Sequence, residues 1–175
     1  MKYLTIILKG PLQYYAPKNH IPNGVTGPYY KTLKFPSKKA VVGMIGATLG
    51  VPHESKEFWD LYDELDVKYK VTHRGSVLVD FQTIGSDDGY LPTVDGGKKE
   101  ANGVKRVEYL QDYAFEAYVG ASDERLKQIF DGFCNPIYLP YLGKRCCFHN
   151  HPFVTTFKLI SEEELEETLH VHDCP

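Results

Sequence analysis

The spacing of apolar residues along the chain predicts strands and helices in alternation. Residues 3–8 are nearly all apolar and stop at Gly10 and the proline after it, a pattern typical of a buried first strand. Apolar positions then recur at helical spacing after Ser37, which stands at an N-cap position, and before Gly50, which provides a C-terminal stop. This pattern predicts a helix over residues 37–50.

Two glycines, Gly43 and Gly46, lie inside this predicted helix. A glycine in a helix interior costs up to about 1 kcal/mol relative to alanine. We therefore expect both glycines to pack closely against a neighbouring element, since close packing would offset that cost.

Further helices are predicted by apolar stripes that follow N-cap residues. A stripe after Ser55 (Phe58, Leu61, Tyr62 and Leu65) predicts a second helix whose remaining surface is acidic. Ser122 opens a third helix that ends before Pro136. Ser161 and Glu164 form a capping box, which predicts a short acidic helix near the C-terminus.

Period-two patterns predict the remaining strands. They indicate a β-hairpin built from residues 67–72 and 76–84, one strand over 108–119 and a last strand over 153–160. In chain order the elements give an α+β class compatible with a ferredoxin-like sheet. We expect one domain over 1–160, followed by a short acidic helix and tail over 161–175.

Residues 85–106 follow neither the helical nor the strand period. They hold five glycines and four basic residues, Lys98, Lys99, Lys105 and Arg106. A loop this long inside a compact domain is usually functional or disordered.

Charge is divided unevenly along the chain. The first fifty residues contain seven lysines and no aspartate or glutamate, whereas the whole chain has a net charge of −3. The other 125 residues therefore hold 13 basic and 23 acidic residues. The N-terminal lysines alternate with tyrosine, proline and glycine, which suits single-stranded nucleic acid because phosphates pair with cations and bases stack on rings. A solvated loop whose tyrosines pack on the domain has the same composition, so both interpretations stay open.

The sequence also bears on the compartment. No apolar run approaches the ~20 residues that span a bilayer, and the N-terminus lacks the features of a secretory signal. We therefore expect a cytoplasmic protein with no membrane partner. The four cysteines (Cys134, Cys146, Cys147 and Cys174) have no Cys-x-x-Cys spacing, so reduced thiols are expected.

Several short motifs, in order, resemble one known family. They are Gly10-Pro11-Leu12-Gln13 leading to the segment from Phe35-Pro36-Ser37 to Ala47, then Asp80-Phe81-Gln82-Thr83, Arg106 to Ala117, Pro140 to Cys147, and His151-Pro152-Phe153. Their order and spacing resemble the CRISPR-associated Cas5 family, above all its type I-E, CasD-like branch. The resemblance runs from residue 1 to about residue 155.

The resemblance implies both a fold and a role. The fold would be an RNA-recognition-like RAMP domain with a long β-hairpin thumb, here at about 85–106. The role would be that of a non-catalytic subunit of a Cascade surveillance complex in antiviral defence, which holds the 5′ handle of the CRISPR RNA (crRNA). Its partners would be that RNA, the backbone and large subunits, and target DNA indirectly through the complex. No cofactor is expected.

Residue charge and position, together with the resemblance, give the expected RNA contacts. A first set lies near the predicted helix start, where free backbone N–H groups also attract anions: Tyr30, Lys31, Lys34, Ser37, Lys38 and Lys39. A second set is the thumb residues Lys98, Lys99, Lys105 and Arg106. Lys144 and Arg145 complete the list, after Gly143, whose backbone we expect to approach a phosphate closely.

The chain also departs from the family it resembles. Type I-E members continue through further β-structure, so we expect that part to be either shortened or replaced here by the acidic segment 162–173. A type I-C branch cuts precursor crRNA without metal, using a tyrosine, a lysine and a histidine. The candidates here are Tyr30, Lys34, Lys144, His149 and His151, but no Lys-His pair occurs and the type I-C tyrosine position falls on Lys31. RNA binding without cleavage is preferred, and the endoribonuclease is the alternative.

Cysteines and histidines form one more candidate site. Two His-x-His pairs with nearby thiols could chelate zinc: Cys146, Cys147, His149 and His151, with His170, His172 and Cys174. Neither segment has the spacing of a familiar zinc module, and buried cysteines beside a frayed tail explain the same residues. We therefore expect no metal site.

Overall fold

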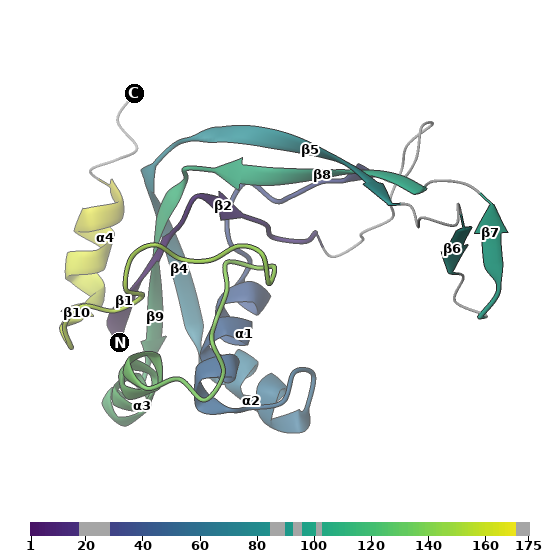
Figure 1. The fold of residues 1–175 in the computed structure, drawn as a ribbon. Coiled ribbons are helices and arrows are strands. Elements are labelled where there is room, and N and C mark those ends of the chain that lie inside the picture. The colour runs from purple at the N-terminus through teal and green to yellow at the C-terminus, as the bar shows by residue number, and fades with distance from the viewer. Residues whose placement is uncertain (18–28, 85–89, 93–95, 101–102, 171–175) are drawn as a thin grey trace.

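A four-stranded antiparallel sheet forms the body of the protein in a computed structural model that describes residues 1–17, 29–84, 90–92, 96–100 and 103–170. Its strands are β1 (Lys2–Lys9), β4 (Asp66–His73), β9 (Ala114–Ala121) and β10 (Leu159–Ser161), in the order β10-β1-β9-β4. The strand that comes last along the chain thus pairs with the first, and the first pairs with the third (Figure 1). This is the ferredoxin-like arrangement, so the predicted α+β fold class is confirmed.

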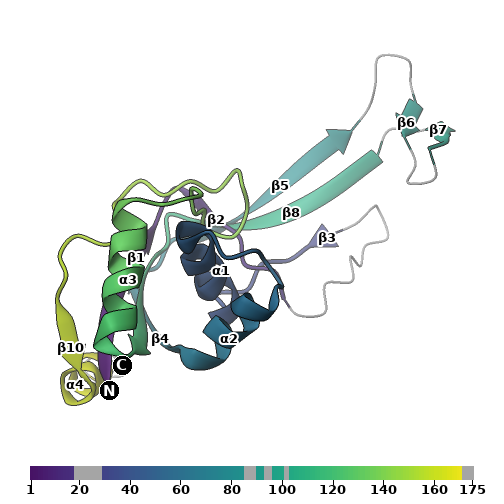
Figure 2. The same cartoon turned by 90° about the horizontal axis from the view of Figure 1, so that it is seen from below.

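Helices cover one face of this sheet and part of the other. α1 (Lys38–Leu49), α2 (Lys56–Glu64) and α3 (Asp123–Cys134) lie together on one side (Figure 2). Alternate residues of β1 and β9 are buried against them, and the core includes Leu4, Ile6, Leu8, Ile45, Phe115, Val119 and Leu126. On the opposite face, α4 (Glu162–His170) buries Leu165 against Tyr3 and Tyr118.

The helix starts are those that the sequence predicts. The hydroxyl oxygens of Ser37, Ser55 and Ser122 accept hydrogen bonds from the backbone N–H three residues on, at 3.2, 3.1 and 3.3 Å. Ser161 and Glu164 form the reciprocal bonds of a capping box.

The predicted hairpin of 67–72 with 76–84 is wrong. β4 pairs with β9, and β5 (Ser76–Ile84) pairs instead with β8 (Gly103–Gln111). The chain therefore passes from β4 to β5 without reversing, in one long ribbon that bends where it leaves the body (Figure 1). Gly75 allows the bend, because an added Cβ there would lie 1.9 Å from the carbonyl oxygen of Gln111.

The single strand predicted over 108–119 is also divided by this bend. It consists of the end of β8 and most of β9, separated at Asp112, whose backbone has φ 58°. The last strand predicted over 153–160 is wrong for most of its length, since β10 begins at Leu159. The preceding segment contributes one backbone hydrogen bond to β1, from the N–H of Ile7 to the carbonyl oxygen of Phe153, at 2.7 Å.

β5 and β8 form an arm that extends from the body (Figures 1 and 2). β2 (Leu12–Gln13) and β3 (Tyr29–Tyr30) pair with β8, antiparallel and parallel respectively. A small antiparallel pair, β6 (Tyr90–Pro92) with β7 (Lys98–Glu100), lies in the range predicted as a thumb. Residues 85–89, 93–95 and 101–102 lie outside the described residues, so the thumb stays a prediction, as does the division at residue 160.

None of the described helices is long and apolar enough to cross a bilayer.

Candidate nucleic-acid interface

Lys144 is surrounded by aromatic rings from three distant segments. Its ammonium nitrogen lies 4.1 Å from the ring centroid of Tyr14, 5.4 Å from that of Tyr109 and 6.0 Å from that of Tyr30. We call Tyr14, Tyr30, Tyr109 and Lys144 the tyrosine–lysine cluster. A cation over several ring faces is attracted by each of them, and more strongly when it is partly desolvated.

The arm positions the three tyrosines. Tyr109 lies on β8, Tyr30 lies on β3 beside it, and Tyr14 directly follows β2 on the same edge. Tyr14 and Tyr109 make an edge-to-face contact with centroids 6.1 Å apart. The pairing of β2 and β3 with β8 thus brings together residues far apart in the sequence.

A tight turn brings Lys144 to this edge. Gly143 has φ 91°, and an added Cβ would lie 1.6 Å from the carbonyl oxygen of Tyr14. The N–H of Tyr14 donates to the carbonyl oxygen of Leu142 at 3.0 Å, which fixes the turn on the strand edge. The close approach that Gly143 allows is therefore to the chain's own backbone, and no phosphate is needed to explain this glycine.

Burial shapes the electrostatics of the cluster. It lowers the pKa of Lys144, and neighbouring Lys105 lowers it further, while Cys146 and Asp80 act in the opposite direction. Burial also raises the pKa of Tyr14 and Tyr109, so both phenols keep their protons near neutral pH. Lys144 makes no ion pair with a described carboxylate, so a phosphate would find its ammonium group available.

Further predicted residues lie along the same edge of the arm. Glu108 holds β3 in place, because it accepts hydrogen bonds from the hydroxyl of Tyr29 and from the backbone N–H of Thr32. Lys31 lies 5.7 Å from the ring centroid of Tyr29, and the guanidinium of Arg106 lies 5.2 Å from that of Phe81. The structure thus places Lys31, Lys105 and Arg106 on the arm and its neighbouring strand.

A second basic group lies at the start of α1, and much of it is already engaged within the protein. Ser37 caps its own helix. Lys38 lies 4.5 Å from the ring centroid of Tyr62, and Lys39 lies 5.2 Å from that of Trp59. Lys39 also pairs with Glu54 at 2.8 Å. The net positive charge here is smaller than the sequence suggests.

Four predicted contact residues remain. Lys34 and Arg145 are exposed, and Lys98 and Lys99 lie on the backbone of β7, their side chains outside the described residues. Of the seven N-terminal lysines, Lys2 pairs with Asp123 at 2.5 Å, and Lys18 lies outside the described residues.

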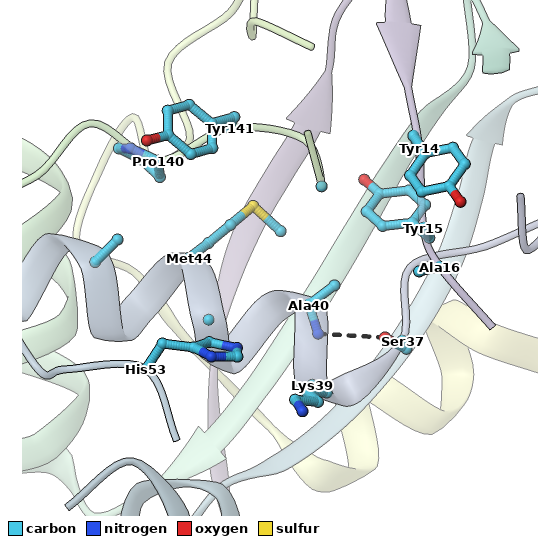
Figure 3. Close-up of a pocket in the computed structure, with 13 residues that line it drawn as sticks. Tyr14, Tyr15, Ala16, Ser37, Lys39, Ala40, Met44, His53, Pro140 and Tyr141 are labelled. Atoms are coloured by element: carbon cyan, nitrogen blue, oxygen red, sulfur yellow. Dashed lines mark hydrogen bonds between the residues drawn. The ribbon is translucent and has the colours of Figure 1, made fainter. Parts of the chain in front are cut away.

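A cavity of about 340 Å³ lies between the two basic groups. Figure 3 shows α1 on one side of it, Pro140 and Tyr141 on the other, and Tyr14 and Tyr15 at one end. Of the residues that line it, sequence reasoning predicted Ser37 and Lys39 as site residues and missed the apolar and aromatic ones, and it also missed Tyr109 of the cluster. Their apolar or aromatic character at strand and helix spacing indicates core packing, and Tyr14 and Tyr109 are indeed buried. The strand pairing that brings them to Lys144 is not visible locally.

The cysteines and histidines do not form a joint site in the described part of the chain. Cys147 is buried, whereas exposed Cys146 has its sulfur 3.9 Å from the hydroxyl of Tyr109. The ring of His149 packs on Phe153 with centroids 4.3 Å apart. No group of three or more metal-ligating side chains occurs among the described residues, which leave out His172 and Cys174.

Comparison with known proteins agrees with these features. A family model described as CRISPR-associated protein (Cas_Cas5) matches residues 5–175. The chain belongs to the Cas5 family. It is 25% identical over 160 residues to "CRISPR system Cascade subunit CasD" of Escherichia coli (strain K12), which covers 86% of this chain and 68% of that protein.

Solved structures share the fold of this Cas5 chain. A chain of a "CRISPR RNA-guided surveillance complex" matches with a TM-score of 0.77 at 27% identity, over 94% of this chain and 66% of that one. A "Crystal structure of Cas protein" matches with a TM-score of 0.66 at 23% identity, over 94% and 69%. The chain thus spans about two thirds of the length of these relatives.

The motif segments of this Cas5 chain meet in space. An added Cβ at Gly10 would lie 2.3 Å from the carbonyl oxygen of Phe148, so the first motif packs against the stretch that follows the 140–147 motif. Asp80 pairs with Val107 in the register of β5 and β8. Together with the turn at Gly143, these contacts assemble the edge that holds the tyrosine–lysine cluster.

Proposed function

We propose that this chain is a crRNA-binding subunit of a Cascade-type surveillance complex and holds the 5′ handle of the RNA without cutting it. The tyrosine–lysine cluster carries the proposal, because it presents a cation with no described carboxylate partner among phenol rings in a Cas5 chain. A phosphate bound at Lys144 would gain a charge-assisted hydrogen bond. Tyr14 and Tyr109 are buried, so a neighbouring base could stack only on Tyr30, the partly exposed ring of the cluster.

The remaining basic residues of the arm would follow the RNA backbone. Lys105 lies on the same face of β8 as Tyr109 and would meet a strand that reaches Lys144. Arg106 points to the opposite face, over Phe81, and Lys31 lies over Tyr29, so RNA would meet these two where it crosses the edge of the arm. Lys98, Lys99, Lys34 and Arg145 would extend the same path. Lys38 and Lys39 would contribute less, since Glu54 offsets part of their charge.

Protein partners would occupy other surfaces. The exposed acidic residues of α2 and α4 repel phosphates and suit contacts with the backbone and large subunits. Target DNA would be met through the assembled complex, in the cytoplasm and in antiviral defence.

Cleavage is not part of the proposal. Attack by a ribose 2′-OH needs a base near the scissile phosphate. The phenols of Tyr14 and Tyr109 stay protonated because burial raises their pKa, and the His149 ring is packed on Phe153. These three groups are therefore poorly suited to act as that base.

The test is RNA binding by the assembled complex and by the full chain, using the repeat-derived handle RNA of the same locus. Lys144→Gln combined with Lys105→Gln should weaken binding and lower the slope of log affinity against log salt by about 1.4 to 1.8, since each lost phosphate contact lowers it by roughly 0.7 to 0.9. Lys127→Gln is the matched control, because Lys127 also lies over two rings but on α3.

Two outcomes would contradict the proposal. One is handle binding that the double variant leaves unchanged in affinity and salt slope. The other is specific cleavage of repeat RNA in EDTA that is lost in His149→Ala or His151→Ala, which would favour the endoribonuclease alternative.

A further inference from the structure

The cavity beside α1 has an open wall where a helix would normally carry a side chain. Gly43 lines this wall, and an added Cβ there would meet nothing within 4 Å. Gly46, one turn further on the same helix, instead has Val51 and Phe58 within 3.7 to 3.8 Å of an added Cβ. The expectation that both glycines serve close packing is therefore wrong for Gly43, which leaves the cavity open.

The walls of the cavity suit a flat, uncharged group. Met44, Tyr141, Pro140 and Tyr15 supply thioether, aromatic and aliphatic surfaces (Figure 3). The volume of about 340 Å³ lies within the roughly 300–1,000 Å³ of small-ligand pockets. Such surfaces bind a planar ring by stacking and dispersion.

The titratable side chains that line the cavity stand at its margins. Lys39, which pairs with Glu54, and His53 line one part, and Tyr14, whose ring lies under Lys144, lines another (Figure 3). An uncharged interior with flanking cations matches a nucleotide in a chain, whose base is neutral and whose phosphates on both sides are anionic. An apolar peptide side chain would not account for Lys144, which has no described carboxylate partner beside the cavity, and a free phosphate would not account for the walls.

We propose that this pocket takes one unstacked nucleobase of the bound RNA, with Gly43 kept free of a side chain to admit it. The inference rests on the proposed function and adds a base-binding subsite to a surface that otherwise contacts sugar and phosphate. A base held there would fix the register of the RNA against the arm.

The test is an abasic scan of the handle RNA, in which each base is removed in turn, measured by fluorescence anisotropy with the full chain. With the wild type, one position should weaken binding by about tenfold when its base is removed, as expected for loss of a stacked base. Gly43→Leu fills the pocket, so it should bind intact RNA about tenfold more weakly and become insensitive to that position. Gly46→Ala adds a Cβ that contacts Val51 and Phe58 and does not line the cavity, so it should keep the wild-type profile.

A second pair of variants covers the case in which Gly43→Leu fails to fold. Tyr141→Ala removes a wall and should reduce the effect of the same abasic position, whereas Tyr138→Ala, three residues earlier and 63% exposed, should not. Two results would overturn the pocket and leave the proposed RNA binding in place. One is an equal loss of affinity for intact and abasic RNA in the pocket variants, and the other is an abasic profile that both pocket variants leave unchanged. If the wild type binds none of the RNAs, the proposed function fails with it.

Discussion

Two lysines with similar surroundings differ in what they can offer a ligand. Lys39 and Lys144 each lie over an aromatic ring, at 5.2 Å from Trp59 and 4.1 Å from Tyr14. Lys39 is exposed and paired with Glu54, while Lys144 is half-buried and has no described carboxylate partner. The comparison teaches that lysine density along the sequence is a weak guide to a binding site, because the cation that matters comes from the acidic part of the chain.

The largest expected effect comes from the turn that presents Lys144. Gly143→Ala should lower the free energy of unfolding by about 3 kcal/mol, because the new Cβ meets the Tyr14 carbonyl at a backbone conformation that disfavours alanine. Gly96→Ala is the control, since Gly96 has φ 77° but nothing within 4 Å of an added Cβ. It should cost only about 1 kcal/mol. Chemical denaturation measures both, and equal losses would show that the contact with Tyr14 is unimportant.

Removing each lysine charge tests the comparison directly. Lys144→Gln should reduce affinity for handle RNA by about tenfold, as expected when a charge-assisted hydrogen bond is lost. Lys39→Gln should change it by less than about twofold, because an exposed, paired charge contributes little. Anisotropy titrations at one salt concentration decide the order, and a larger loss at Lys39 would reverse the assignment.

The segment that carries Lys144 should also respond to acid. Burial lowers the pKa of His149, and its Nδ1 is buried without a partner among the described residues. The unfolded chain then binds more protons than the folded one just below the ordinary histidine pKa, so stability should fall as the pH drops below about 6.5. His149→Asn should flatten that fall, measured by denaturant unfolding at several pH values. His73→Asn, at an exposed histidine at the end of β4, should leave it in place; an unchanged profile in both variants would contradict the account.

The smallest effect should come from releasing Lys39. Glu54→Gln removes its partner, so RNA affinity should rise by about twofold at low salt and return to the wild-type value at high salt. Glu57→Gln, on the same acidic surface, serves as the control. If RNA affinity falls instead, Glu54 holds Lys39 in position for RNA, and the contrast between Lys39 and Lys144 is wrong.

The sequence predicts the local features of this fold well. Helix starts at Ser37, Ser55, Ser122 and Ser161 follow from hydrogen bonds within one turn, and the long strands β4, β5 and β9 follow from alternation. The bend between β4 and β5 could not be predicted, because a glycine such as Gly75 occurs in the sequence both at hairpin turns and where two backbone segments approach closely. Which strands pair depends on contacts far along the chain, and these carry no local signal.

The site is predictable to a smaller extent, for the same reason. Lys144 is expected from its place after Gly143, but its rings come from Tyr14, Tyr30 and Tyr109, which strand pairing brings together. The pairing of Lys39 with Glu54 depends on how α1 and α2 pack. The pocket at Gly43 follows from the empty space beside α1, which only the packed structure reveals.

Photo-crosslinking tests the central claim most directly. The assembled complex would carry handle RNA substituted with 4-thiouridine at each position in turn, and mass spectrometry would locate the crosslinked residues. If the RNA binds at the tyrosine–lysine cluster, crosslinks are expected on Tyr30, Tyr14 or residues next to Lys144, and none on Trp59 or Tyr62. Crosslinks confined to Trp59 and Tyr62 would place the RNA on α2 and contradict the claim.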